Sequence, residues 1–328
     1  MSTINYLSIL KKAWSITWTN KYLWWFGFFA TLGSCGGINI FFDGVEENLD
    51  PVKEQQILEF FSKNFHWIIA IAIILFLLFI IFLILGTIGR GALISSIGKN
   101  LKEQHSNFKI SWQEGKKNFW KIFAINFSLG LFILLTLLIL IAPVATLFLN
   151  KNYIIGGILA FIAILIFIPI AILTCYLKTY GYIYAVLGKL KFWPAIENAY
   201  NLFAKNLTSS VLMSLIFIPL GIIFMLIIFV AIPILFFVFL ILCGIAYLAL
   251  GKIAAIIFGA IGIIIFLTYA LFVRSIFEVF AQTVWILFFH KIATPKVKEL
   301  VVEEEKEKEI ASKPLPIIEA KKIPKAEL

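Results

Sequence analysis

Long stretches without a charged side chain constrain this sequence more than any other feature. Asp, Glu, Lys and Arg are absent from five runs, which are 64–89, 122–150, 152–177, 206–251 and 253–273. A helix of about 20 apolar residues crosses a hydrocarbon core of about 30 Å, so each run is long enough to span a membrane. The runs are continuously apolar rather than alternating, which indicates helices instead of barrel strands. We therefore expect an all-α, polytopic transmembrane helical bundle.

The overall composition agrees with a membrane protein. Hydrophobic residues make up 62% of the 328 residues and charged residues only 14%. A soluble domain of this length needs far more charge on its surface. The net charge of +10 does not indicate a nucleic-acid partner, because the basic residues are concentrated in connections between the apolar runs.

These connections alternate in charge along the chain. Residues 1–21 carry three lysines, and the connections 90–121 and 178–206 carry net charges of +5 and +3, whereas 43–65 carries −4. Lys and Arg in short loops favour the cytoplasmic side of a membrane. We therefore expect the N-terminus and both basic connections in the cytoplasm and 43–65 outside.

Six spans are expected, near 22–42, 67–89, 122–149, 154–177, 207–231 and 253–273. The fifth run is too long for one span and contains Pro219 and Pro233. We expect one crossing there, followed by a re-entrant or tilted apolar piece over roughly 233–250. The membrane domain is then 1–293, and an even number of spans places the C-terminus in the cytoplasm. The charged, proline-containing tail 294–328 is expected to be disordered.

The expected spans form a three-fold internal repeat. The second, fourth and sixth spans end at Arg90, Lys178 and Arg274, and each continues as a further helical stretch. The other three spans are each preceded by an amphipathic segment that is expected to lie at the membrane interface. Such a unit places the three basic residues on the same side of the membrane.

Aromatic and basic residues mark the expected cytoplasmic boundary. The Trp side chain prefers the membrane–water interface, and nearby cations attract anionic headgroups by about 1 kcal/mol per charge. Ten residues are expected to anchor the protein at this interface: Trp14, Trp18, Trp24, Trp25, Arg90, Trp112, Trp120, Lys178, Trp193 and Arg274. The expected partner is the lipid bilayer, including its anionic lipids. Both ordinary anchoring and recognition of one lipid remain open.

Residues suited to catalysis are scarce. The spans contain neither an HExxH or GxSxG motif nor paired carboxylates. Glu114, Glu197 and Glu278 lie in the cytoplasmic segments, where a glutamate is expected to be solvated or paired with lysine. Uncharged polar groups in the spans are expected to bond to a backbone carbonyl or to another helix; these are Asn126, Ser128, Thr136, Thr146 and Thr174. We expect no enzyme, no cofactor site and no metal site.

The cysteines do not indicate a disulfide framework or a zinc site. Cys35, Cys175 and Cys243 are far apart and have no histidine nearby. The sequence Leu-Gly-Ser-Cys that ends at Cys35 is similar to a lipoprotein cleavage box. An aromatic-rich, uncleaved first helix is the favoured interpretation.

Two segments carry a resemblance to a known group. NYLSILKKAWSITWTNKYLWWFGFFATLG at the start and FEVFAQTVWILFFHKI near the end resemble uncharacterised bacterial six-helix membrane proteins. That group is similar to the membrane domain fused to some glycerophosphoryl diester phosphodiesterases. The resemblance covers roughly residues 5–292 and carries over no catalytic residue. It implies a stand-alone module in the bacterial plasma membrane.

Two functions are compatible with these features. The first is a non-enzymatic scaffold or accessory module of the cell envelope, linked to lipid metabolism and bound to a membrane protein partner. The alternative is a permease or a transporter of lipids or small solutes. Its site is expected between repeats, near the proline-containing fifth and sixth spans.

Overall fold

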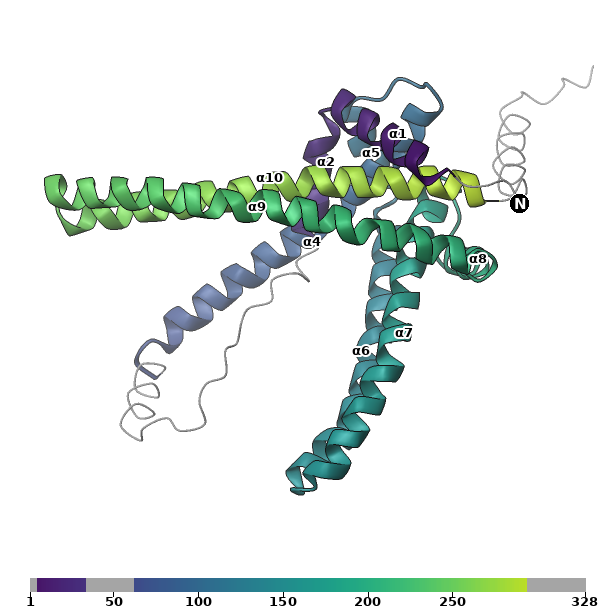
Figure 1. The fold of residues 1–328 in the computed structure, drawn as a ribbon, viewed down its shortest axis with the longest axis horizontal. Coiled ribbons are helices and arrows are strands. Elements are labelled where there is room, and N and C mark those ends of the chain that lie inside the picture. Colours follow the sequence, from purple (N-terminus) through teal and green to yellow (C-terminus); the bar gives the residue numbers. More distant parts are fainter. Residues whose placement is uncertain (1–4, 34–61, 294–328) are drawn as a thin grey trace, which may run out of the picture. The chain divides into compact units, whose positions relative to one another are not determined.

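The structure is a computed structural model that describes residues 5–33 and 62–293 (Figure 1). Every regular element in these residues is a helix, which confirms the predicted all-α fold. The helices are α1 (Tyr6–Thr19), α2 (Leu23–Leu32), α4 (Phe65–Leu101), α5 (Phe108–Lys117), α6 (Phe119–Leu149), α7 (Tyr153–Val186), α8 (Phe192–Lys205), α9 (Leu207–Leu250) and α10 (Lys252–Ile292). Cys35, most of the acidic connection 43–65 and the tail 294–328 lie outside the described residues.

Five of these helices are long and apolar enough to cross a membrane, namely α4, α6, α7, α9 and α10. The chain is therefore a multi-pass membrane protein. The expected spans 67–89, 122–149, 154–177 and 253–273 lie within α4, α6, α7 and α10. The apolar helix α2 has ten residues, and the expected span 22–42 continues beyond the described part of the chain.

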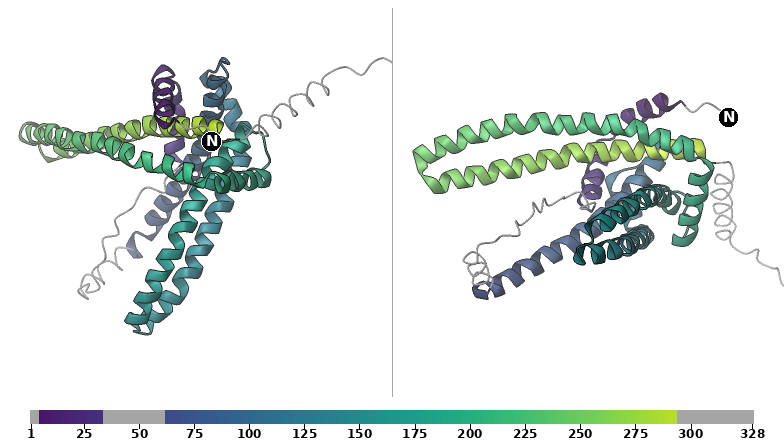
Figure 2. Two further views of the ribbon diagram at one scale, coloured as in Figure 1. Left: turned by 45° about the vertical axis from the view of Figure 1, so that its right-hand side comes forward. Right: turned by 60° about the horizontal axis from the view of Figure 1, so that its bottom comes forward.

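The helix α9 differs from the expected division of the fifth run. It is one continuous helix of 44 residues that includes Pro219 and Pro233, so 233–250 is not a separate re-entrant piece. Each proline removes one backbone hydrogen bond, but leaving the helix in an apolar environment removes many more. At about 1.5 Å per residue, α9 is about 66 Å long, which exceeds the thickness of a hydrocarbon core. Figure 2 shows it curving beside α10 along its whole length.

Contacts between the helices repeat three times. The two apolar helices of each unit pack together, as α2 with α4, α6 with α7 and α9 with α10. Figures 1 and 2 show the last two pairs as antiparallel hairpins. The short helices α5 and α8 pack on α4 and α7 of the preceding unit, and α1 packs on α10 of the last unit. The contacts therefore close into a ring, which supports the predicted internal repeat.

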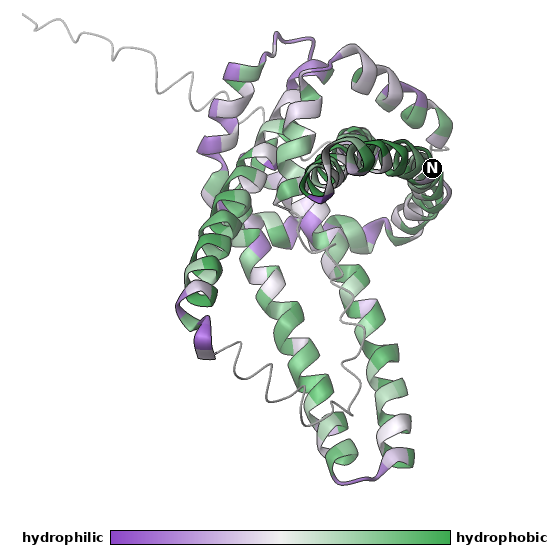
Figure 3. Cartoon of the chain, turned by 90° about the vertical axis from the view of Figure 1, so that its left-hand side faces the viewer, coloured by the Kyte–Doolittle hydropathy of each residue, from purple (hydrophilic) through white to green (hydrophobic). Residues whose placement is uncertain are grey.

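The buried core lies in the C-terminal parts of the second long helices. In α4, every residue from Gly86 to Gly98 except Arg90 is buried. Residues 180–186 of α7 and most residues over 273–289 of α10 are buried as well. The remaining parts of the long helices are apolar and exposed (Figure 3). Lipid tails are as apolar as these side chains, so only the inner parts of the helices need protein partners.

The short helix α8 has a buried face, an exposed apolar face and an exposed polar face. In α8, Ala195 and Ala199 are buried against the protein, whereas Trp193 and Tyr200 are exposed apolar side chains. Glu197 lies on the remaining face and is exposed. A helix with a protein face, an apolar face and a polar face suits a position at the membrane boundary.

Candidate functional site

The three basic residues that end the second, fourth and sixth expected spans lie around one cavity. Arg90 of α4, Lys178 of α7 and Arg274 of α10 all line an open cavity of about 530 Å³. Small-ligand sites in proteins have volumes of roughly 300–1,000 Å³. The sequence predicted a common membrane side for these residues, and the structure brings them to a common site.

Helical spacing directs several side chains of α7 and of α10 into this cavity. Arg274, Glu278 and Gln282 follow one another at intervals of four residues and form one face of α10. Lys178 and Tyr182 have the same interval on α7 and also line the cavity. Both α7 and α10 therefore contribute a polar face next to an otherwise apolar span.

Arg90 lies at the centre of contacts between three helices. Its guanidinium carbon is 5.3 Å from the centre of the Tyr182 ring, a distance that allows a cation–π interaction. The Tyr182 hydroxyl donates a hydrogen bond of 3.2 Å to Oδ1 of Asn126 on α6. The positions of Arg90, Tyr182 and Asn126 are therefore coupled across α4, α7 and α6.

The described lining of the cavity is cationic. Three side chains carry a positive charge and Glu278 carries a negative one, so the formal charge of these four groups is +2. Arg274 is exposed, while Lys178 and Glu278 are half-buried. Both arginines retain their charge at any physiological pH. The cavity therefore has the electrostatics of a site for anions.

Gln282 supplies an unsatisfied hydrogen-bond donor at the same cavity. The side chain is 8% exposed, and its Nε2 atom has no hydrogen-bond partner among the residues that the structure describes. A buried amide without a partner costs about 1–3 kcal/mol, so such groups are uncommon in folded proteins. The Nε2 atom has almost no accessible surface, so a ligand in the cavity would reach it only after the side chain turns.

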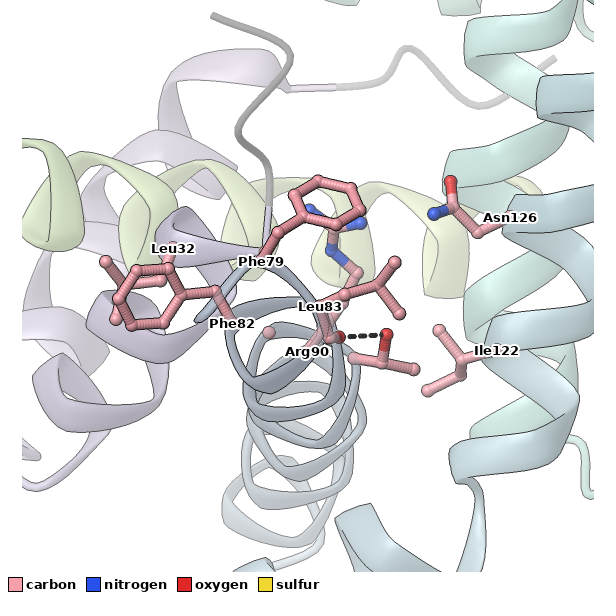
Figure 4. Close-up of a pocket in the computed structure, with 10 residues that line it drawn as sticks. Leu32, Phe79, Phe82, Leu83, Arg90, Ile122 and Asn126 are labelled. Atoms are coloured by element: carbon pink, nitrogen blue, oxygen red, sulfur yellow. Dashed lines mark hydrogen bonds between the residues drawn. The ribbon is translucent and has the colours of Figure 1, made fainter. Parts of the chain in front are cut away.

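A second, mostly apolar cavity adjoins the cationic one. Its volume is about 350 Å³, and it shares Gly33, Arg90 and Asn126 with the first cavity. Its remaining lining comes from α2, α4 and α6: Leu32, Phe79, Phe82, Leu83, Gly86, Thr87 and Ile122. Figure 4 shows Leu83 and Arg90 of α4 facing Ile122 and Asn126 of α6. A charged region and an apolar region therefore meet at Arg90.

The three glutamates that were expected on the cytoplasmic side have different surroundings. Glu114 Oε1 lies 3.9 Å from Lys99 Nζ, which confirms the expected pairing with lysine, and Glu197 is exposed. Glu278 instead lines the cationic cavity. Its spacing from Arg274 on α10 was visible in the sequence, but its neighbours from α4 and α7 were not.

The expected anchoring tryptophans fall into two groups. Trp25, Trp120 and Trp193 are the most exposed, with 62–74% of their surface accessible, and Trp14 and Trp18 are exposed as well. Trp24 and Trp112 are half-buried between helices. The Trp24 indole donates a hydrogen bond of 2.9 Å to the Thr17 carbonyl, and Trp112 stacks on Phe26 and Phe108.

Four of the five polar groups named for the spans bond as expected. Thr136, Thr146 and Thr174 each donate to a carbonyl of their own helix, at 2.8 Å. Asn126 accepts from another helix. Tyr182 and Gln282 were not predicted as site residues, because a tyrosine or glutamine near a span end is not distinctive before its partners are known.

Comparisons with known proteins add no relative. No model of a protein family, no curated protein and no solved structure matches this chain. The fold and the cavity therefore define its class, which is a multi-pass, all-α membrane protein with a cationic cavity where its repeated units meet.

Proposed function

We propose that this protein is a non-enzymatic accessory module of the bacterial plasma membrane that binds an anionic ligand in the cationic cavity. One observation carries the proposal: each of the three repeated units contributes one cation, Arg90, Lys178 or Arg274, to the same cavity. Cations held close together in a partly desolvated site repel each other, and Glu278 offsets only one of them. An anion that enters the cavity relieves this repulsion.

The donors around the cavity suit a phosphate-type group. Arginine guanidinium groups bind phosphate oxygens through paired N–H donors, and lysine adds a point charge. Among these described residues, Glu278 is the one acid–base group of the carboxylate type, so the site is better suited to binding than to hydrolysis.

Charge-neutralising variants test this proposal in neutral-lipid nanodiscs, with inorganic phosphate as the probe at constant ionic strength. A ligand that binds only the folded protein at 100 times its Kd stabilises it by about 2.7 kcal/mol. Phosphate should therefore raise the Tm of the wild-type protein. Lys178→Gln and Arg274→Gln should remove most of this increase.

The matched control uses exposed lysines outside the cavity, Lys205→Gln and Lys291→Gln. These variants lose the same charge and should keep the full response to phosphate. An equal response in all four variants would mean that phosphate acts as a general salt, and the proposal would be wrong.

A transporter of anionic solutes or lipids is the second candidate. It is favoured by the position of the cavity, because transporter sites commonly lie between structural repeats. The two adjoining cavities are lined by residues of α2, α4, α6, α7 and α10, and neither includes Pro219 or Pro233. Proteoliposomes loaded with labelled phosphate separate the two candidates. Flux that depends on Arg274 favours a transporter, and a co-purifying protein partner without flux favours an accessory module.

A further inference from the structure

We infer that the anionic ligand is a membrane lipid, with its headgroup phosphate in the cationic cavity and an acyl chain in the adjoining apolar cavity. This inference rests on the proposed anion site and names the chemical class of its ligand. The starting observation is that the two cavities share Gly33, Arg90 and Asn126. A ligand that fills both has to be charged at one end and apolar at the other.

The apolar cavity extends in the direction that an acyl chain needs. Phe79, Leu83 and Arg90 lie on one face of α4, at positions separated by four and seven residues. At about 1.5 Å per residue, Phe79 lies about 16 Å before Arg90 along the helix axis. The direction from Arg90 to Phe79 runs from the buried part of α4 to its exposed apolar half. A chain attached to a phosphate at Arg90 therefore runs from the charged site toward the hydrocarbon region.

The side chains around the apolar cavity leave it accessible from the lipid phase. Phe79 is 51% exposed, and Phe82 and Leu83 are half-buried. Across the cavity, Ile122 of α6 is buried. A lipid can therefore enter sideways between α4 and α6 without passing through the core. A free anion without an apolar part would gain no binding energy from this apolar surface.

The phosphate and the acyl chain of the ligand would contact different residues, so separate variants test the binding of each end. Leu83→Trp fills the apolar cavity and leaves the cations in place. Ile84→Trp is the matched control, because Ile84 is the next residue of α4, is 39% exposed and does not line either cavity. Arg274→Gln removes a cation, with Lys205→Gln as its control.

The test compares three probes on the purified full chain in a neutral detergent. These are dioleoyl phosphatidylglycerol, dioleoyl phosphatidylcholine and the chainless sn-glycerol 3-phosphate, with Kd values measured by native mass spectrometry. We expect phosphatidylglycerol to bind at least 10-fold more tightly than either other probe. Leu83→Trp should weaken phosphatidylglycerol at least 5-fold and leave glycerol phosphate unchanged. Arg274→Gln should weaken both anionic probes.

The outcomes separate this inference from the proposed function. Equal Kd values for the lipid and glycerol phosphate, with no effect of Leu83→Trp, would assign the site to a free anion. That result overturns the lipid inference and leaves the anion site intact. Equal binding of the anionic and zwitterionic lipids, with no effect of Arg274→Gln on either anionic probe, would mean that charge is not recognised, and it would overturn both. A Leu83→Trp effect that Ile84→Trp reproduces also overturns the lipid inference.

Discussion

At the scale of single residues, Gly115 shows how closely the short helices approach the long ones. A Cβ atom at this position would collide with the Ile88 carbonyl oxygen of α4 and lie 3.0 Å from the Ala92 side chain. Backbone atoms of a packed helix cannot move aside easily. The absence of a side chain at Gly115 therefore permits α5 to pack against α4.

Gly115→Ala is expected to destabilise the protein by about 1–3 kcal/mol, because overpacking strains both helices. Thermal unfolding in nanodiscs, followed by intrinsic fluorescence, measures this as a lower Tm. Gly130→Ala is the matched control, since a Cβ atom at this position of α6 would have no atom of the described residues within 4 Å. That substitution should leave the Tm unchanged or raise it through better helix propensity. A similar loss in both variants would contradict the close packing of α5.

A buried pair of hydroxyl groups joins α7 to α9. Tyr180 is fully buried, and its hydroxyl lies 2.8 Å from the Ser210 hydroxyl, which is also fully buried. Tyr180→Phe should lower the free energy of unfolding by about 1 kcal/mol, because the Ser210 hydroxyl loses this partner.

Thermal unfolding of Tyr180→Phe, Ser210→Ala and the double variant measures the coupling between the two hydroxyls. The double variant should cost less than the sum of the single ones. Tyr184→Phe serves as the control, because the Tyr184 hydroxyl makes no hydrogen bond to another described residue. Strict additivity of the two single effects would argue against the contact.

At the scale of elements, the hairpin of α9 and α10 has a defined register. Phe224 of α9 lies 4.7 Å from Phe277 of α10 between ring centres, and the Cβ position of Gly259 lies 3.8 Å from the Cys243 sulfur. These contacts require α9 to continue as a helix well beyond Pro233. A re-entrant piece over 233–250 would not keep this register.

Gly259→Cys is therefore expected to form a disulfide with Cys243 under mild oxidation, because its Cβ atom would lie 3.8 Å from the Cys243 sulfur and a rotation of the side chains can bring the two sulfurs together. The test uses a background with Cys35→Ser and Cys175→Ser and a protease site inserted at Gly251. After cleavage, the two fragments should remain joined until a reductant is added. Ile257→Cys, which lies on the opposite side of α10 and is 54% exposed, should give separate fragments. Separate fragments for both variants would contradict the register.

At the scale of the whole molecule, the expected orientation in the membrane follows from the arrangement of hairpins. The turn at Lys151 joins α6 to α7, and the turn at Gly251 joins α9 to α10. At the opposite ends of these hairpins, Lys117 is the last residue of α5 and precedes α6, and Lys205 is the last residue of α8 and precedes α9. The basic connections predict that the latter ends face the cytoplasm.

Cysteines introduced at Lys151 and Lys252 should react with a membrane-impermeant maleimide in intact cells, whereas cysteines at Lys117 and Lys205 should react only after permeabilisation. All four lysines are exposed, so accessibility within the protein is matched. The native cysteines are replaced by serine in this experiment. Labelling at Lys151 but not at Lys252 would place the two hairpin turns on different sides and would contradict the three-fold repeat.

The amino-acid sequence by itself determined the class of this protein and the order of its elements. Uncharged runs of more than 20 residues have few stable alternatives to helices in a membrane, because each backbone polar group needs an internal partner. The spacing of Trp193 and Tyr200 likewise placed both on one apolar face of α8, since helical periodicity is a local property. The position of Arg90, Lys178 and Arg274 at span ends was equally visible.

Only the tertiary structure decided which side chains share a site. The cavity combines Asn126, Tyr182, Glu278 and Gln282, which come from three helices, with the three cations. Their meeting depends on the rotation and crossing of helices that are far apart along the chain, and periodicity within one helix carries no information about either. The continuity of α9 through two prolines was decided in the same way, because an apolar environment penalises unpaired backbone groups more than local propensity favours a break.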